Sequence, residues 1–184
     1  MIRLSYPFQR TCNETPMPEA QKVEFLIAES AIRQLYARYN DALWRKDSDA
    51  FVDCFAAGAV WKIAGLTICG SAEIRSLFEK YMAAYHKVMM FTGIPVLDVG
   101  MGTATGRVPI TEYSKLPDGQ AIRTLGIYYD RYVEEAGRWR FSWRHFNLYY
   151  YGPPDFSEPY YECREYGPPP AIPGPNDPTT VRRS

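Results

Sequence analysis

The chain has 184 residues, of which 46% are apolar and 15% aromatic, and its 21 basic and 21 acidic side chains give a formal net charge of zero. This composition is typical of one globular domain and excludes a largely disordered chain. Nucleic-acid binding depends on clustered Lys and Arg, so the lack of a basic run excludes that partner. No apolar stretch approaches the roughly 20 residues that span a bilayer, and residues 1–7 do not form a secretory signal. We therefore expect a cytoplasmic protein without a membrane partner.

Metal-binding patterns are absent from the sequence. The four cysteines are far apart, and the two histidines, His86 and His145, form no H-E-x-x-H motif. We expect no metal site. The 15 Tyr, 9 Phe and 4 Trp exceed what exposed surfaces need, which predicts that some rings line a cavity.

The first half of the chain is predicted to be mainly helical. Residues 1–17 show no periodic spacing of apolar residues, which predicts an extended arm. Apolar residues at three- and four-residue spacing predict a helix over 19–46, and a short helix over 49–56 follows. Residues 59–63 and 66–69 predict a hairpin, and Ser71 is the expected N-cap of a third helix that runs to about Tyr85.

The second half is predicted to be a meander. Extended runs separated by turn sequences cover 88–91, 96–99, 103–113, 121–133 and 138–151. Residues 152–184 contain 9 of the 15 prolines and form a Pro/Tyr-rich tail. We expect its first half to lie against the body or a neighbouring subunit and 173–184 to be loose. The expected organisation is thus an arm (1–17), a domain (18–151) and the tail.

This order of elements, with the closing run Tyr129-Asp130-Arg131-Tyr132-Val133 followed by Gly137-Arg138-Trp139-Arg140-Phe141, resembles the SnoaL-like branch of the nuclear transport factor 2-like superfamily over residues 20–151. The resemblance implies an α+β cone, with N-terminal helices packed on a curved, mostly antiparallel sheet around a central cavity. Within the superfamily the chain is similar to the branch of scytalone dehydratase, bile acid dehydratase and hexachlorocyclohexane dehydrochlorinase. These enzymes eliminate without a cofactor, so none is expected here.

The resemblance also implies site residues. His86 matches the histidine that removes a proton, and the aspartate that orients it falls on Trp44. Tyr39 matches a Tyr or Lys that precedes that aspartate by five residues. Arg144 matches an arginine that assists departure of the leaving group, and Trp61 matches a tryptophan of the pocket. A histidine base needs a partner for its second ring nitrogen, so the missing carboxylate requires a replacement.

Two carboxylates are candidates for that replacement. Asp41 lies on the same helix, and Glu112 is preferred because Val108 and Ile110 match pocket-lining positions and strand parity puts Glu112 on their face. Desolvation there would raise its pKa toward neutrality. Parity likewise predicts that the inner face carries Ile122, Thr124, Gly126, Tyr128, Ser142, Arg144, Phe146, Leu148 and Tyr150, and that the outer face carries Trp143, His145 and Asn147. The expected substrate-binding residues are Trp44, Trp61, Val108, Ile110, Thr124, Tyr128, Phe146 and Leu148.

Each candidate also has a structural interpretation. His86 could be a structural residue at a helix-to-strand junction, and Glu112 could be a solvated residue at a strand end. Arg144 could belong to a surface ion pair. Tyr39 could be a core residue, and Asp41 an exposed acid on the helix.

The resulting hypothesis is a cofactor-independent lyase, dehydratase-like or deformylating, acting on a hydrophobic aromatic molecule such as a phenolic or lignin-derived diaryl compound. His86 or Glu112 is the base, Tyr39 donates a hydrogen bond and Arg144 stabilises negative charge. The alternatives are a polyketide- or steroid-type isomerase or cyclase, and a non-catalytic binding protein, which Trp44 in place of the aspartate favours.

Assembly is the last expectation. Trp139, Phe141, Trp143 and Tyr149 are predicted to form an apolar outer stripe that a partner covers. Related enzymes are trimers whose C-terminal segments reach their neighbours, so a homo-oligomer is expected, with a trimer favoured over a dimer.

Overall fold

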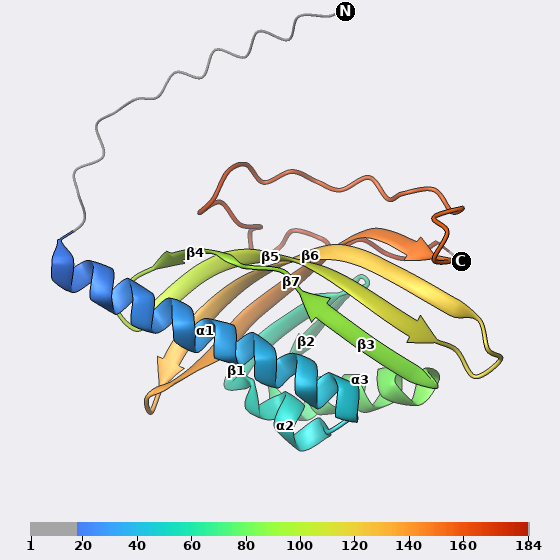
Figure 1. Cartoon of the computed structure of the whole chain (residues 1–184), viewed down its shortest axis with the longest axis horizontal. Helices are drawn as coiled ribbons and strands as arrows, with labels where there is room; N and C mark the ends of the chain where they lie inside the picture. The colour runs from blue at the N-terminus through green and yellow to red at the C-terminus, as the bar shows by residue number, and fades with distance from the viewer. Residues whose placement is uncertain (1–17, 184) are drawn as a thin grey trace, which may run out of the picture.

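In a computed structural model, which describes residues 18–183, three helices lie on one side of a curled sheet and the C-terminal segment runs along the other (Figure 1). The helices are α1 (Glu19–Arg45), α2 (Ser48–Asp53) and α3 (Gly70–Ala84). The strands are β1 (Phe55–Ile63), β2 (Leu66–Cys69), β3 (Lys87–Thr92), β4 (Val96–Val99), β5 (Thr103–Lys115), β6 (Ala121–Glu135) and β7 (Arg138–Gly152).

The strands form one sheet in the order β2-β1-β7-β6-β5-β3, with β4 paired to β5. The pair β1–β7 is parallel and the other pairs are antiparallel. The predicted α+β class, with N-terminal helices on a curved, mostly antiparallel sheet, is confirmed.

The long helix α1 follows from its apolar spacing. The buried side chains recur every three or four residues and form one face against the sheet. The helix ends where Lys46 adopts a left-handed conformation and its N–H donates to the carbonyl of Leu43. Its observed bounds agree with the prediction to within one residue.

The short helix α2 ends earlier than predicted. It begins after Asp47, whose carboxylate accepts a hydrogen bond from the N–H of Ala50 at 2.9 Å. It stops because the carbonyl of Cys54 accepts from the N–H of Phe141 and Phe55 begins to pair with β7. Residues 55–56 therefore belong to β1.

The N-terminus of α3 also differs from its prediction. Cys69, not Ser71, is the N-cap, and the carboxylate of Glu73 accepts the Cys69 N–H at 2.9 Å. The acid in the first turn thus makes the reciprocal bond of a capping box, whereas no side chain at the N-cap accepts the first-turn N–H groups as Ser71 was expected to do.

Two register irregularities in β7 change which side chains face the interior. The pairing with β6 shifts between Arg131 and Tyr132 and again between Leu125 and Gly126. Between the shifts, the predicted inner positions 144, 146 and 148 are correct. Before the first shift and after the second, the alternation of inward- and outward-facing side chains along β7 is reversed. Phe141 therefore belongs to the core, and Tyr150 packs on Phe156 and Tyr160 of the C-terminal segment. The predictions that Ser142 and Tyr150 face the cavity are wrong.

The predicted apolar stripe is not exposed. Trp139, Phe141 and Trp143 retain 5%, 0% and 7% of their exposure within a single chain, and Tyr149 is half-buried. Trp139 and Phe141 belong to the core. Trp143 lies beneath Arg131 and stacks on His145, as its outer-face assignment predicts. The stripe therefore gives no argument for assembly, and the trimer stays a prediction.

The C-terminal segment packs on the outer face of its own chain. The N–H of Tyr161 donates to the carbonyl of Tyr149, and the ring of Tyr166 meets that of Tyr129 edge-on. Further along, Lys62 Nζ donates to the carbonyls of Pro175 and Asp177 at 2.9 and 2.5 Å. The prediction that this stretch is loose is wrong for 173–183, because the buried ammonium of Lys62 needs those carbonyls.

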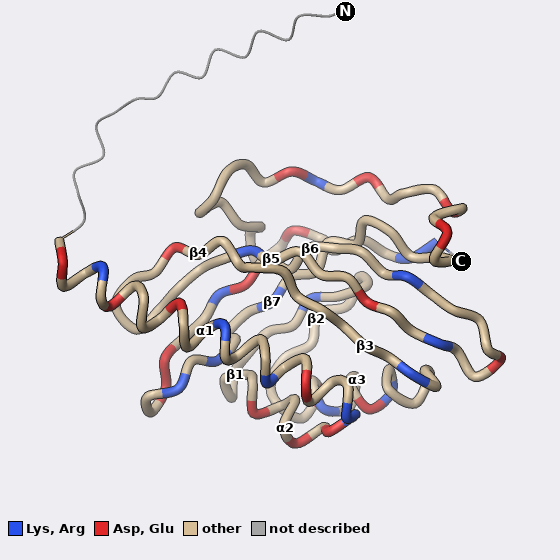
Figure 2. Tube along the Cα trace, in the orientation of Figure 1, with Lys and Arg blue, Asp and Glu red and all other residues tan. Residues whose placement is uncertain are grey.

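Charge is distributed over the whole fold. Figure 2 shows Lys and Arg interspersed with Asp and Glu along the helices and strands. Within residues 18–183, none of the helices has the length and apolar character that a membrane span requires.

The close approach of β6 and β7 at Gly126 gives a test of this packing. A Cβ at Gly126 would overlap the ring of Phe146 and the carbonyl of Asn147, whereas a Cβ at Gly58 would meet no atom within 4 Å. We expect Gly126→Ala to lower the free energy of unfolding by about 1–3 kcal/mol and Gly58→Ala to change it by about 0.5 kcal/mol or less. Urea unfolding of both variants measures this, and equal midpoints would contradict the packing.

Candidate functional site

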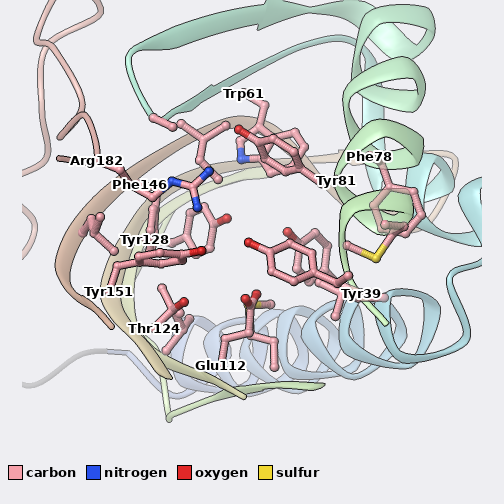
Figure 3. A pocket seen from close by; sticks show the side chains of 18 of the residues that line it. Tyr39, Trp61, Phe78, Tyr81, Glu112, Thr124, Tyr128, Phe146, Tyr151 and Arg182 are labelled. Carbon is pink, nitrogen blue, oxygen red and sulfur yellow. The ribbon is translucent and has the colours of Figure 1, made fainter. Parts of the chain in front are cut away.

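A cavity of about 100 Å³ lies between the inner face of the sheet and the helices (Figure 3). Its wall is mainly aromatic and apolar, with few polar groups, as ligand sites commonly are. Eight residues expected from the sequence line it: Tyr39, Trp61, Ile110, Glu112, Thr124, Tyr128, Phe146 and Leu148.

Other lining residues were not predicted. They come from the helices, from β1, β3 and β7, from the β1–β2 turn and from the C-terminal segment: Leu43, Phe51, Ile63, Ala64, Phe78, Tyr81, Met82, Tyr85, Met90, Tyr151, Thr180 and Arg182. Tyr151 was missed because the second irregularity of β7 turns it inward. The tail's composition predicted packing only for its first half, and Arg182 was missed because it lies in the stretch, 173–184, that was expected to be loose.

Five expected site residues do not line the cavity: Trp44, Asp41, His86, Val108 and Arg144. Trp44 is 41% exposed and its indole N–H donates to the carbonyl of Met90 at 2.8 Å. Asp41 is exposed and paired with Arg45, and the exposed His86 does not line the cavity. Val108 is fully buried in the core rather than in the cavity wall.

Helix geometry explains the errors on α1. Tyr39 faces the cavity, and a residue five positions later is rotated roughly 140° around the helix. Trp44 therefore cannot share the face of Tyr39. Asp41, two positions later, is rotated roughly 200° and also points away.

Arg144 is neither a cavity cation nor part of a surface pair. Its Nε and Nη2 donate to the two carboxylate oxygens of Asp130 at 2.8 and 3.2 Å, and both side chains are fully buried. Burial opposes the charge of Arg144, but Asp130 outweighs that effect and raises the pKa of the guanidinium. The predicted role of Arg144 in contact with substrate is therefore not supported by its position.

The Asp130–Arg144 pair holds two cavity rings in place. The guanidinium carbon lies 3.8 Å from the ring centroid of Tyr128 and 4.4 Å from that of Tyr39. The hydroxyl of Tyr36 donates to Asp130 at 2.7 Å, which ties α1 to β6. Burial raises the pKa of Tyr39 well above its usual value and that of Tyr128 to about 12. Both phenols thus stay protonated near neutral pH and can donate hydrogen bonds.

Glu112 is the acidic group of the cavity wall. Strand β5 places it there, as parity predicts, and Figure 3 shows its carboxyl group pointing inward. Burial raises its pKa from 4.5 to about 7, while Arg182 opposes the shift. The interpretation of Glu112 as a solvated strand end is wrong. A carboxyl group that titrates near neutrality can both take up and release a proton.

Two further polar groups of the wall have free hydrogen-bonding capacity. Within residues 18–183 the indole N–H of Trp61 and the hydroxyl of Thr124 are buried and have no hydrogen-bond partner. Such groups favour a ligand that supplies partners. In the same part of the chain, no three His, Cys, Asp or Glu side chains gather as a metal site would require.

Residues 24–145 match the SnoaL-like domain. The chain belongs to this family. No curated protein matches it.

Solved structures share the fold of this SnoaL-like chain at low sequence identity. A scytalone dehydratase-like protein from Novosphingobium aromaticivorans is 16% identical, with a TM-score of 0.68 over 82% of this chain and 99% of the other. The hexachlorocyclohexane dehydrochlorinase LinA-type3 from Novosphingobium barchaimii is 18% identical, with a TM-score of 0.66 over 77% and 99%. Rv3472 from Mycobacterium tuberculosis, of unknown function, is 23% identical, with a TM-score of 0.62 over 71% and 74%. These likenesses establish the SnoaL-like fold.

Removing the charge of Asp130 tests the buried pair. We expect Asp130→Asn to lower the free energy of unfolding by about 3–5 kcal/mol, because Arg144 stays buried without a counter-ion. Asp53→Asn is the matched control, since Asp53 pairs with Arg138 and Arg140 at the surface, and its loss should be about 1 kcal/mol or less. Urea unfolding measures both, and equal losses would show that the buried pair is not the stronger constraint.

The raised pKa of Glu112 predicts a pH-dependent stability. Between pH 4.5 and about 7 the folded chain holds a proton that the unfolded chain releases, so stability falls as pH rises through this window. Glu112→Gln removes this dependence. The stability of the variant relative to the natural chain should increase from pH 4.5 to pH 8 by an amount on the order of 3 kcal/mol. Parallel stability curves over this range would argue against a raised pKa.

Proposed function

We propose that the protein is a cofactor-independent enzyme that abstracts a proton from a small hydrophobic molecule, and that it acts as a lyase. The observation that carries this proposal is Glu112, a carboxyl group with a pKa of about 7 that points into a mainly aromatic and apolar cavity (Figure 3). General bases work best when their pKa lies near the working pH. SnoaL-like neighbours that are named as a dehydrochlorinase support the same class of reaction.

In this proposal, ionised Glu112 takes a proton from a carbon atom of the substrate. The electron pair of the broken C–H bond forms a double bond, and the leaving group departs with its own bonding pair as hydroxide or halide. The hydroxyl groups of Tyr39 and Tyr128 donate hydrogen bonds to the oxygen on which negative charge develops. Protonated Glu112 then releases its proton to the leaving group or to water.

The cavity volume narrows the substrate class. An engineered apolar cavity of roughly 150 Å³ takes up benzene, so a cavity of about 100 Å³ corresponds to one ring at most. This size favours a single-ring phenolic or similarly compact substrate. A diaryl compound would need the cavity to widen, which Arg182 and Thr180 at its edge would have to permit.

An isomerase or cyclase is the second candidate. One carboxyl base together with phenol donors also suits a reaction in which a proton leaves one carbon and returns to another through an enolate. Release of a fragment, followed by mass spectrometry, separates a lyase from an isomerase. The binding-protein alternative loses its main support, because Trp44 lies outside the cavity.

Proton abstraction can be measured without knowing the substrate. We expect the protein to accelerate deuterium uptake from D2O into phenylacetone, a one-ring ketone with acidic C–H bonds, as followed by proton NMR. The rate should rise with pH through about 7 as Glu112 ionises. Glu112→Gln should lower it by about 10²- to 10⁴-fold.

His86→Ala is the control, because His86 is exposed and outside the cavity. It should leave the exchange rate unchanged. Equal rates for Glu112→Gln and the natural chain would remove Glu112 from the mechanism, and exchange that disappears in His86→Ala would transfer the role of base to that residue.

A further inference from the structure

We infer that Arg182, brought to the cavity by the C-terminal segment, binds an anionic group of the ligand, so that the site selects small one-ring molecules that carry a carboxylate. This inference depends on the proposed function only in taking the cavity as the substrate site. It assigns the ligand class through a residue that lies outside the matched SnoaL-like domain, which ends at residue 145.

The segment around Arg182 is anchored on both sides. Before it, the hydroxyl of Thr179 accepts the N–H of Gly65 at 2.7 Å. After it, Arg183 donates to the carbonyls of Pro159 and Tyr160, each at 3.1 Å, and its guanidinium lies 4.5 Å from the ring centroid of Tyr161. These contacts hold the backbone of Arg182 at the edge of the cavity, and Figure 3 shows its guanidinium pointing inward.

The guanidinium of Arg182 has no counter-ion among residues 18–183. It lies 4.5 Å from the ring centroid of Tyr151 and is close to Tyr85. By contrast, Arg164 of the same segment pairs with Asp177, and Arg183 is bound to backbone carbonyls. An arginine keeps its charge at any ordinary pH and presents a planar set of N–H donors that fits a carboxylate. Arg182 is exposed, so water can solvate its guanidinium when no ligand is bound, and a ligand carboxylate would replace that water with an ion pair.

Glu112 does not serve as that partner. It and Arg182 are the charged side chains of the cavity wall; they point inward from opposite sides and form no ion pair. A ligand can therefore place its carboxylate at Arg182 and a C–H bond at Glu112, with its ring against the aromatic wall between them. The arrangement separates recognition of charge from proton transfer.

Two probes of equal shape test this inference. Benzoate and benzamide differ in charge, and their binding can be measured by isothermal titration calorimetry. We expect the natural chain to bind benzoate up to about 5-fold more tightly than benzamide, because Arg182 is exposed and solvent screens an ion pair with it. Arg182→Gln should abolish the preference, and Arg182→Lys should keep part of it.

Arg38→Gln is the matched control, because it removes the same charge from an exposed residue of α1 that does not line the cavity. It should preserve the preference. Thermal unfolding of each variant shows whether the fold is retained, and Arg182→Met provides a second neutral variant if Arg182→Gln unfolds. Equal affinities for the two probes in the natural chain, or an unchanged preference in a folded neutral variant, would overturn the inference.

The pH dependence adds an independent readout. The titratable groups that face Arg182 in the cavity are Glu112, Tyr39, Tyr81, Tyr85, Tyr128 and Tyr151. Burial raises the pKa of Tyr39, Tyr81, Tyr85 and Tyr128 above its usual value. Ionisation of Glu112 between pH 6 and 8 should thus weaken benzoate binding, and Glu112→Gln should remove this dependence. If Glu112→Gln abolishes deuterium exchange but the natural chain does not prefer benzoate to benzamide, only the proposed role of Arg182 is wrong. If the natural chain prefers benzoate but Glu112→Gln leaves deuterium exchange unchanged, only the proposed role of Glu112 as base is wrong.

Discussion

The buried ion pair between Asp130 and Arg144 is the constraint on which the rest of the interior depends. A guanidinium removed from water is costly unless a carboxylate faces it with good geometry, and here both oxygens of Asp130 do so. Since the pair joins β6 to β7 and Tyr36 adds a bond from α1, the two central strands and the long helix have one mutual arrangement. The rings of Tyr39 and Tyr128 pack against the guanidinium, which fixes their positions.

The same interior treats its two carboxyl groups differently. Asp130 has a cation within hydrogen-bonding distance, so its charge is compensated inside the protein. Glu112 faces the cavity without such a partner, and burial raises its pKa to about 7. One acid is therefore committed to structure, while the other remains free to exchange a proton. Asp130 thus helps to shape the wall of the cavity, and Glu112 gives that wall a reactive group.

Much of this arrangement is predictable from the sequence, and the exceptions have physical causes. Helical spacing predicts α1, and strand alternation correctly places Glu112, Thr124 and Tyr128. The prediction from strand alternation is wrong at Tyr150 because a bulge in β7 reverses the inward and outward positions beyond it. The residue types at this point of the sequence do not indicate a bulge. Trp44 and His86 were assigned by resemblance, and their side chains turn out to point elsewhere. Arg182 could not be placed, because the path of an irregular segment depends on tertiary contacts such as those of Lys62.

The anchoring of the C-terminal segment by Lys62 has a kinetic consequence. Two backbone carbonyls of the segment satisfy a buried ammonium group, so moving the whole segment would leave that charge without partners. The least costly way to open the edge of the cavity is rotation of the Arg182 side chain about its own bonds. Rotamer changes of exposed side chains take picoseconds to nanoseconds, whereas loop opening takes far longer. Ligand entry past the Arg182 side chain would thus need no slow rearrangement of the backbone.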